Sequence, residues 1–191
     1  MTSRQPDVER RSEHERFARI DAAFRAGDLD ALRGAVEDPG VVPNGPMPLA
    51  IGPCLVYAIY HSPPAFIRTL LEQGADPKGH DHDGFPPLIA ALSCARSHAG
   101  APARPDVTEI IRLLLAFGAD PHQRGINDYT ALHMAVAQGN LDAIRILLEA
   151  GADPRLRTRI DDCETAREMA EASGLHAIAR LLAASEAKLG N

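Results

Sequence analysis

The sequence predicts an all-α stack of repeated helix-turn-helix units. The tetrapeptide Gly-Ala-Asp-Pro occurs three times, beginning at Gly74, Gly118 and Gly151, so the last two copies are 33 residues apart and the first two 44. Each copy follows an amphipathic run with apolar residues at helical spacing, as in 141–148. A fixed period in this range is typical of chains that bury apolar faces between successive units. The pattern therefore indicates a solenoid and favours a binding surface over a reaction centre.

Each unit is expected to contain a turn, a short helix, a longer helix and a terminal glycine. In the best-defined unit the short helix follows Thr130, a glycine comes at Gly139, and the longer helix ends at Gly151. Glycine accepts the left-handed conformation that ends a helix, and the nearby proline prevents continuation. Asp153 is expected to hydrogen-bond local backbone and to begin the next turn.

Residues 127–154 resemble an ankyrin repeat. The family pattern is Thr-Pro-Leu-His-x-Ala, a glycine, an Ile/Val-Leu-Leu helix and Gly-Ala-Asp, and this chain reads Thr-Ala-Leu-His-Met-Ala from Thr130. The resemblance implies an all-α ankyrin-repeat solenoid with short β-hairpin-like turns. It also implies that Thr130 is a helix N-cap and that His133 is structural, bridging neighbouring turns through hydrogen bonds.

The repeat frame divides the chain into five units within one domain at 16–185. The expected segments are a polar N-terminal tail at 1–15, a cap at 16–40, repeats at about 50–82, 83–126 and 127–160, a cap at 161–185, and a tail at 186–191. The second repeat of the three carries an 11-residue insertion, 95–105, whose glycine and prolines predict a loop. A partner-specific role and mere tolerance of extra length both remain open for it.

Composition limits the function classes. The net charge of −6 argues against a general nucleic-acid binder, and no apolar stretch is long enough for a membrane span. The charged segment 1–15 lacks the apolar run of a signal peptide, so a cytoplasmic location is expected. Cys54, Cys94 and Cys163 form no Cys-x-x-Cys pair and are expected to be reduced thiols.

No catalytic arrangement is predicted, and no cofactor. The densest cluster of reactive side chains is His80-Asp81-His82-Asp83, in which His80 and His82 share one side of an extended segment and could begin a zinc or nickel site. A closed site needs about four ligands, and no third or fourth has matching spacing. The alternative is a solvated turn at Asp83-Gly84. We therefore expect neither a metal site nor an enzyme.

The segment 155–159 presents arginines at every second position. If the backbone is extended, Arg155, Arg157 and Arg159 lie on one face and form a basic lane for an acidic partner. The alternative is pairing within the chain to Asp161, Asp162 and Glu164, and the sequence does not decide between the two. A nucleic-acid adaptor using this lane would bind polyanions with strong salt dependence.

The resemblance implies partner contacts through the turn tips and the exposed face of the first helix of each unit. The partner-binding residues expected from these positions are Tyr60, His61, His80, His82, Phe85, Arg124, Ile126, Asn127, Tyr129, Gln138, Arg157 and Arg159, with Met47 and Leu49 as further positions. Tyr60, Phe85 and Tyr129 are the expected aromatic anchors. The alternative is that they pack only against the adjacent turn.

These observations predict a non-catalytic protein-binding module, acting as an adaptor or a stoichiometric inhibitor. An immunity or antitoxin-type neutraliser of a co-produced toxin or enzyme is the alternative within this class. The competing class is a metal-dependent or enzymatic role at His80 and His82. The chain is expected to be a monomer on its own, with a protein partner and with neither nucleic acid nor membrane as a partner.

Overall fold

The structure is a computed structural model that describes residues 5–79, 85–96, 103–125, 128–159 and 163–189. The chain divides into two compact units, Met1–Gly79 and His80–Asn191. Across the described residues the regular secondary structure is helical, and one isolated antiparallel bridge joins Arg157 and Thr165. The predicted all-α class is confirmed, and the bridge gives the last turn a hairpin-like form.

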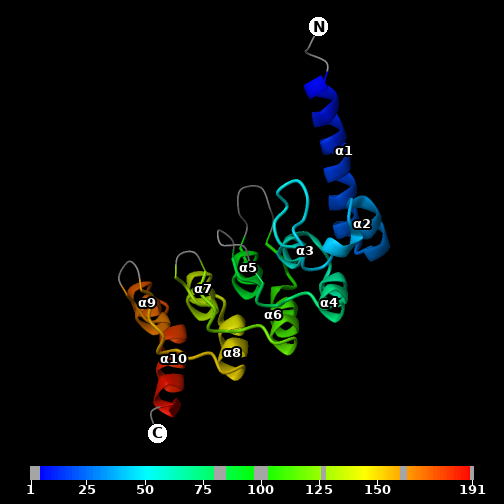
Figure 1. Ribbon diagram of the computed structural model, residues 1–191. Coiled ribbons are helices and arrows are strands. Elements are labelled where there is room, and N and C mark those ends of the chain that lie inside the picture. The colour runs from blue at the N-terminus through cyan, green and yellow to red at the C-terminus, as the bar shows by residue number, and fades with distance from the viewer. Residues whose placement is uncertain (1–4, 80–84, 97–102, 126–127, 160–162, 190–191) are drawn as a thin grey trace. The chain divides into compact units, whose positions relative to one another are not determined.

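Residues 5–79, the described part of the unit Met1–Gly79, form two helix pairs. Its elements are α1 (Gln5–Ala26), α2 (Leu29–Ala35), the 3-10 helix η1 (Pro39–Val41), α3 (Cys54–His61) and α4 (Pro64–Glu72) (Figure 1). α1 packs against α2 and α3, and α3 packs against α4. The ring of Phe24, fully buried, lies 4.7 Å from the ring centre of Tyr57 and 6.0 Å from that of Phe66. These aromatic contacts hold the two pairs together.

α1 extends into the segment that was expected to be a polar tail. It begins at Gln5, so most of 1–15 is helical, and its side chains from Arg10 to Glu15 are exposed. An ion pair between Arg11 and Glu15 (3.3 Å) joins successive turns of this stretch. Such exposed pairs stabilise a helix by only a few tenths of a kcal/mol (about 0.2–0.5). Further along α1, the side chains of Ile20 and Phe24 are fully buried in the core of the unit.

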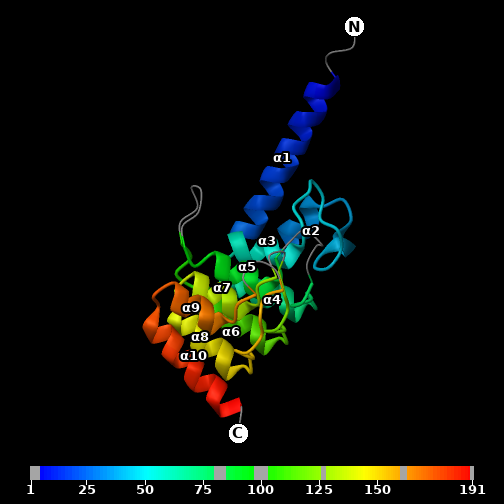
Figure 2. The same cartoon turned by 90° about the vertical axis from the view of Figure 1, so that its left-hand side faces the viewer.

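The described residues of the unit His80–Asn191 form three helix pairs. They are α5 (Pro87–Ser93) with α6 (Val107–Ala116), α7 (Ala131–Ala137) with α8 (Leu141–Glu149), and α9 (Ala166–Ala172) with α10 (His176–Leu189). Figure 1 shows the first helix of each pair in one row and the second in another, and Figure 2 looks along these rows from the end formed by α9 and α10. α7 packs against both α5 and α9, and α6 packs against α8. The core lies between these successive pairs.

The predicted insertion lies between α5 and α6. Among its described residues, the amide of Arg104 donates to the carbonyl of Cys94 (2.9 Å), which closes the base of the insertion. The guanidinium of Arg104 holds both carboxylate oxygens of Asp106 (2.8 and 2.7 Å) directly before α6. The hydrogen bonds from Arg104 lower the pKa of Asp106.

The Gly-Ala-Asp tripeptides end α4, α6 and α8 in the same way. Their glycines have left-handed backbones, with φ of +89° at Gly74, +91° at Gly118 and +87° at Gly151. In the last copy the amide of Ala152 donates to Leu147 (2.9 Å), the amide of Gly151 to Leu148 (3.1 Å), and the amide of Arg155 to the Asp153 carboxylate (3.0 Å). The other two copies repeat these bonds. This confirms both the predicted helix stop and the predicted role of Asp153.

A side chain from the preceding turn fastens two of these helix ends. In the first unit the amide group of Asn44 donates to the carbonyl of Gly74 (2.7 Å) and accepts from the amide of Asp76 (2.9 Å). In the second unit Nε2 of His122 accepts from the amide of Asp153 (3.0 Å). Successive turns are therefore joined by side chains as well as by apolar packing.

None of the described helices is both long and apolar enough to cross a membrane.

Replacing Gly151 with alanine tests the helix stop. No atom lies within 4 Å of a Cβ added at Gly151, so the penalty comes from the left-handed backbone and is expected to be about 1–2 kcal/mol in the free energy of unfolding. The control is Gly34→Ala within α2, where a Cβ is equally unobstructed but the backbone is helical. That change should stabilise the protein by about 0.5–1 kcal/mol. Urea unfolding followed by circular dichroism measures both, and equal effects would contradict the account.

Candidate protein-binding surface

The turn before α7 is held by His133. Nδ1 of His133 lies 2.9 Å from the hydroxyl of Thr130, the N-cap residue of α7, and accepts from the Thr130 amide (3.4 Å). Because Nδ1 accepts, the proton is on Nε2, which donates to the carbonyl of Glu164 in the next turn (3.2 Å). Burial lowers the pKa of His133 and favours this neutral form. The predicted structural, bridging role of His133 is confirmed.

Asp128 is the centre of a second link between the same turns. Its side chain is only 7% exposed and its backbone is left-handed, with φ of +59°. Arg124 donates to one carboxylate oxygen (2.9 Å), and the guanidinium of Arg159 donates twice to the other (2.9 and 2.7 Å). The amide of Arg159 also donates to Asp128. Burial alone would raise the pKa of Asp128, but these bonds and charges together hold it below its usual value.

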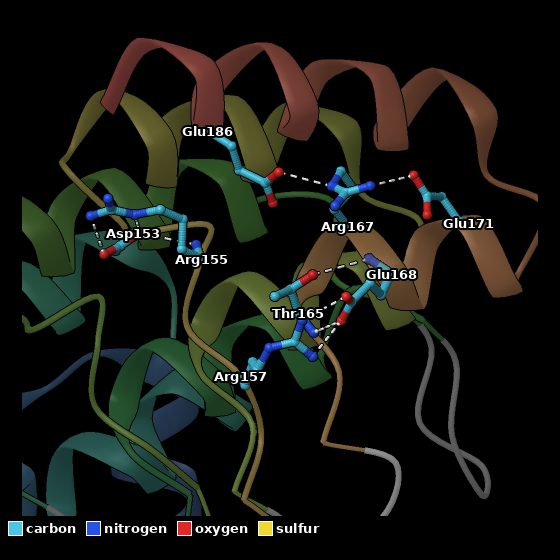
Figure 3. Close-up of polar contacts among 8 residues, drawn as sticks. All are labelled: Asp153, Arg155, Arg157, Thr165, Arg167, Glu168, Glu171 and Glu186. Carbon is cyan, nitrogen blue, oxygen red and sulfur yellow. Dashed lines mark hydrogen bonds and ion pairs between the residues drawn. The ribbon is translucent and has the colours of Figure 1, made fainter. Parts of the chain in front are cut away.

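Glu168 takes the place of the motif histidine in the last unit. It accepts from the amide of Thr165 (2.9 Å), and Thr165 accepts from the amide of Glu168 (3.2 Å), which forms a capping box on α9 (Figure 3). Arg157 binds both oxygens of Glu168 (2.8 and 2.7 Å) and the carbonyl of Cys163 (2.8 Å). The amide of Thr165 and then Arg157 lower the pKa of Glu168.

The preceding residue of the motif, Arg167, joins the two helices of the last pair. Its guanidinium donates to Glu171 on α9 (2.8 Å) and to Glu186 on α10 (2.8 Å) (Figure 3). The family motif has a leucine at this position, where it makes apolar contacts. In the last helix pair Arg167 makes two ion pairs instead.

All three arginines of the segment 155–159 are paired within the chain. Arg155 pairs with Asp153, Arg157 with Glu168 and Arg159 with Asp128 (Figure 3 shows the first two). Of the predicted partners, Asp161 and Asp162 lie outside the described residues, and the carbonyl of Glu164 accepts from Nε2 of His133. The arginine side chains remain 55%, 56% and 73% exposed, so each keeps a face that a partner's carboxylate can reach.

The other predicted contact residues of this unit lie in the turns before α5 and α7 and at the end of α7. Tyr129 is half-buried, and its ring stacks on that of His133 with ring centres 5.7 Å apart. Phe85 is half-buried before α5. Gln138 donates to Sδ of Met134 (3.7 Å), while its buried Oε1 has no hydrogen-bond partner among the described residues. Arg124 also donates to the carbonyl of Arg157 (2.9 Å), so it is as much a structural residue as an available cation.

In the unit Met1–Gly79 the predicted contact residues lie at the end of α3. Tyr60 is 38% exposed, and His61 is half-buried with its ring 4.3 Å from that of Tyr57. Met47 is 7% exposed and belongs to the core, so it was wrongly expected at the surface. The repeat frame places Met47 at a turn tip, but this turn lacks the motif threonine, and Pro53 stands at the N-cap of α3.

Two residues of α1 that the repeat frame did not indicate adjoin this group. Arg25 approaches Nδ1 of His61 (3.4 Å) and pairs with Asp21 (2.7 Å), which also accepts from the hydroxyl of Tyr57 (2.8 Å). Burial and the bond to Asp21 raise the pKa of Tyr57 to about 12. The only sequence signal for the pair was the spacing of Asp21 and Arg25 by one helical turn.

Several predicted residues lie outside the described residues, namely His80, His82, Ile126 and Asn127. The described part of the chain contains no group of three or more His, Cys, Asp or Glu placed to hold a metal ion. Cys54, Cys94 and Cys163 are thiols, and burial raises the pKa of Cys54 to about 12.

The repeated helix pairs and their linked turns agree with the comparison to known families. The chain matches the family described as "Ankyrin repeats (3 copies)" over residues 55–158 and again over 98–190. These matches cover more than half of its length, and the chain belongs to the ankyrin-repeat family. The fold is one that mediates protein–protein interaction and is itself non-catalytic.

Three curated relatives show how far the similarity extends. "Probable E3 ubiquitin-protein ligase XBOS34" of Oryza sativa subsp. japonica is 33% identical over 110 residues, covering 56% of this chain and 19% of the relative. "E3 ubiquitin-protein ligase KEG" of Arabidopsis thaliana is 29% identical over 121 residues, covering 63% and 7%. "Protein phosphatase 1 regulatory subunit 27" of Mus musculus is 44% identical over 45 residues, covering 24% and 29%. The chain spans less than a third of each relative's length.

His133→Gln tests the bridge between turns. Losing the buried bonds to Thr130 and Glu164 should lower the free energy of unfolding by about 1–3 kcal/mol at pH 7.5. Because the pKa of His133 is lowered in the folded state, its stabilising effect is complete above about pH 6.5 and decreases as the pH falls below that value. Urea unfolding at pH 7.5 and 5.5 should therefore show a smaller difference between variant and wild type at pH 5.5. The exposed His176→Gln serves as control, and a difference independent of pH would contradict the prediction.

Asp128→Asn tests the second link. The variant loses its ion pairs with Arg124 and Arg159, and the free energy of unfolding at pH 7 should fall by about 1–3 kcal/mol. The folded-state pKa of Asp128 lies below the ordinary value of 3.8, so the wild-type advantage persists above that pH and is lost as the pH falls below it. Asp142→Asn, at an exposed pair 3.9 Å from Arg145, should change stability by less than about 0.5 kcal/mol. Equal losses in the two variants would refute a special role for Asp128.

Proposed function

We propose that the chain is a stoichiometric protein-binding adaptor or inhibitor that engages its partner through the turn tips and first helices of its repeats. The observation that carries the proposal is the exposure of Tyr60, 38% of whose surface is open to solvent at a position that the repeat frame assigns to partner contact. Large aromatic side chains are enriched at binding hot spots. In the other unit Phe85 and Tyr129 lie in the turns just before α5 and α7, also at frame positions of partner contact, and are half-buried there.

The polar surroundings of these aromatics support the same proposal. Arg157 and Arg159 are held by carboxylates of the chain and are more than half exposed, so their geometry is fixed before binding. A preorganised arginine loses less conformational entropy when it pairs with a partner's carboxylate. Arg25 and His61 offer a comparable polar margin beside Tyr60. Aromatic anchors with a charged rim are the usual composition of a specific protein interface.

The comparisons favour binding to an enzyme as the finer form of this proposal. The mouse relative is by name a regulatory subunit of protein phosphatase 1, and its similarity to this chain is confined to 45 residues. By analogy, we propose that the partner's activity changes when the chain binds. Neutralisation of a co-produced toxin is one example of such a change in activity. It requires that one chain binds one target molecule. The thiol state of the three cysteines suits the reducing cytoplasm that we propose as the location.

The first experiment identifies the partner. The full chain, carrying an affinity tag, is recovered from its native cells together with bound proteins, which mass spectrometry identifies. The captured partner's own activity is then measured with increasing amounts of purified chain. A decrease that is complete at one chain per target supports an inhibitor or neutraliser, whereas unchanged activity supports an adaptor.

The aromatic anchors are tested by substitution. Tyr60→Ala alone, and Phe85→Ala combined with Tyr129→Ala, should each weaken binding of the captured partner about 30-fold or more, because hot-spot residues contribute about 2 kcal/mol or more. Phe117→Ala is the matched control, since Phe117 is 36% exposed at the end of α6 and outside the proposed surface. Calorimetric titration measures affinity, and circular dichroism confirms that each variant is folded. Wild-type affinity in folded anchor variants would refute the proposed surface.

A further inference from the structure

The second helices of the unit His80–Asn191 border a hollow that the proposed partner surface does not use. Its volume is about 670 Å³, within the range of about 300–1,000 Å³ typical of ligand sites. One wall is the C-terminal half of α8 with the turn that follows it, and the other is the C-terminal half of α10 (Figure 1 shows both helices). The turn tips and first helices, which carry the predicted contact residues, lie elsewhere on this unit.

One continuous face of α10 lines this hollow. The α10 residues that border it are Leu181, Ala184, Ser185, Lys188 and Leu189. Their spacing of three and four residues places them on a single stripe along two turns of helix. The second helices α4, α6 and α8 have nine or ten residues, whereas α10 has 14. The stripe therefore continues along a part of α10 that has no counterpart in the shorter helices.

The hollow has an apolar floor. Leu148 of α8 and Leu181 of α10 are half-buried in it, and Leu189 is 50% exposed. Among the large apolar side chains of the described residues, Leu189 has the greatest exposed fraction. Burying such surface is favourable by roughly 25 cal/mol per Å² of apolar area. The floor therefore favours an occupant with a branched aliphatic side chain.

The charges at the edge of the hollow specify the occupant further. Arg155 and Asp153 neutralise each other at 2.9 Å, and Arg145 has only a weak contact with the exposed Asp142 at 3.9 Å. Lys188 is exposed and has no ion pair among the described residues. Besides Asp153, one further carboxylate borders the hollow, that of Glu149, which offsets part of the positive charge of Arg145 and Lys188. In a chain of net charge −6, this local excess of positive charge is complementary to an isolated carboxylate, while Glu149 and Asp153 would repel a polyanion.

We propose that this hollow binds a short segment of a partner protein that carries an aliphatic side chain and one or two carboxylates. The segment places a leucine-like side chain on Leu148, Leu181 and Leu189, and each carboxylate meets one cation, Arg145 on one wall or Lys188 on the other. The site is separate from the turn-tip surface of the proposed function, so the chain is able to hold a second protein while that surface is occupied. This assignment stands even if the turn-tip proposal fails.

A peptide selection tests the proposal with the full chain. A random library of 12-residue peptides displayed on phage is selected on the wild-type protein, and the enriched peptides are measured by fluorescence anisotropy. They should combine Asp or Glu with Leu, Ile or Met. The double variant Arg145→Glu with Lys188→Glu should weaken their binding at least tenfold, and Leu189→Ala at least threefold. All three positions are exposed, so the variants should fold, as circular dichroism will verify.

Arg112→Glu is the matched control. Arg112 is exposed on α6, six residues before Gly118, as Arg145 is six residues before Gly151, but it does not border the hollow. It should leave peptide affinity within twofold of wild type. The proposal is overturned if no peptide is enriched, if the enriched peptides lack acidic residues, or if the double variant binds them as tightly as wild type. It is also overturned if sedimentation shows self-association that the double variant abolishes, since the occupant would then be a second copy of this chain.

Discussion

The left-handed glycine that follows α4, α6 and α8 is the constraint on which this structure depends. At Gly74, Gly118 and Gly151 the helix stops, the following alanine amide bonds back to a leucine carbonyl, and the aspartate begins a turn. The alanine is buried in all three copies, so the stop also anchors the turn to the core. The position of this glycine determines where the following turn and the next first helix begin. A residue with a side chain at the glycine position would strain the backbone or displace the turn.

Side chains join successive turns by hydrogen bonds and so fix the shape of the surface that the turns form. Asn44 fastens one helix end in the first unit, and His122 fastens another in the second. His133 then bonds to the Glu164 carbonyl, and Asp128 receives Arg124 and Arg159. Asn44 and His122 are exposed, whereas His133 and Asp128 are buried, and Tyr129, Arg157 and Arg159 beside them remain accessible. Stability and recognition thus reside in adjacent residues of the same turns, and a partner meets groups whose geometry is already fixed.

The frame predicted the helices, the glycine stops, the role of Asp153 and the bridging histidine, because each depends on local chemistry at fixed spacing. It did not predict Asp153, Glu168 and Asp128 as the carboxylates that receive the arginines, because they lie 2, 11 and 31 residues from their partners and share no common spacing. Glu168 is available to Arg157 because the capping box with Thr165 fixes its side chain. The helical start of α1 at Gln5 was missed because residues before Arg10 and shortly after it carry little apolar periodicity. His80 and His82 stay as predictions from sequence alone.

The central claim is that recognition occurs at the turn tips and first helices, and hydrogen exchange of the chain with its captured partner tests it most directly. Amide exchange is compared, peptide by peptide, between the free chain and the complex. The account predicts slower exchange on binding in α3 and α7 and in the turns that contain Tyr129 and Arg157, with α4 and α6 unchanged. Protection confined to α4 and α6, with no change in α3, α7 and those turns, would contradict it.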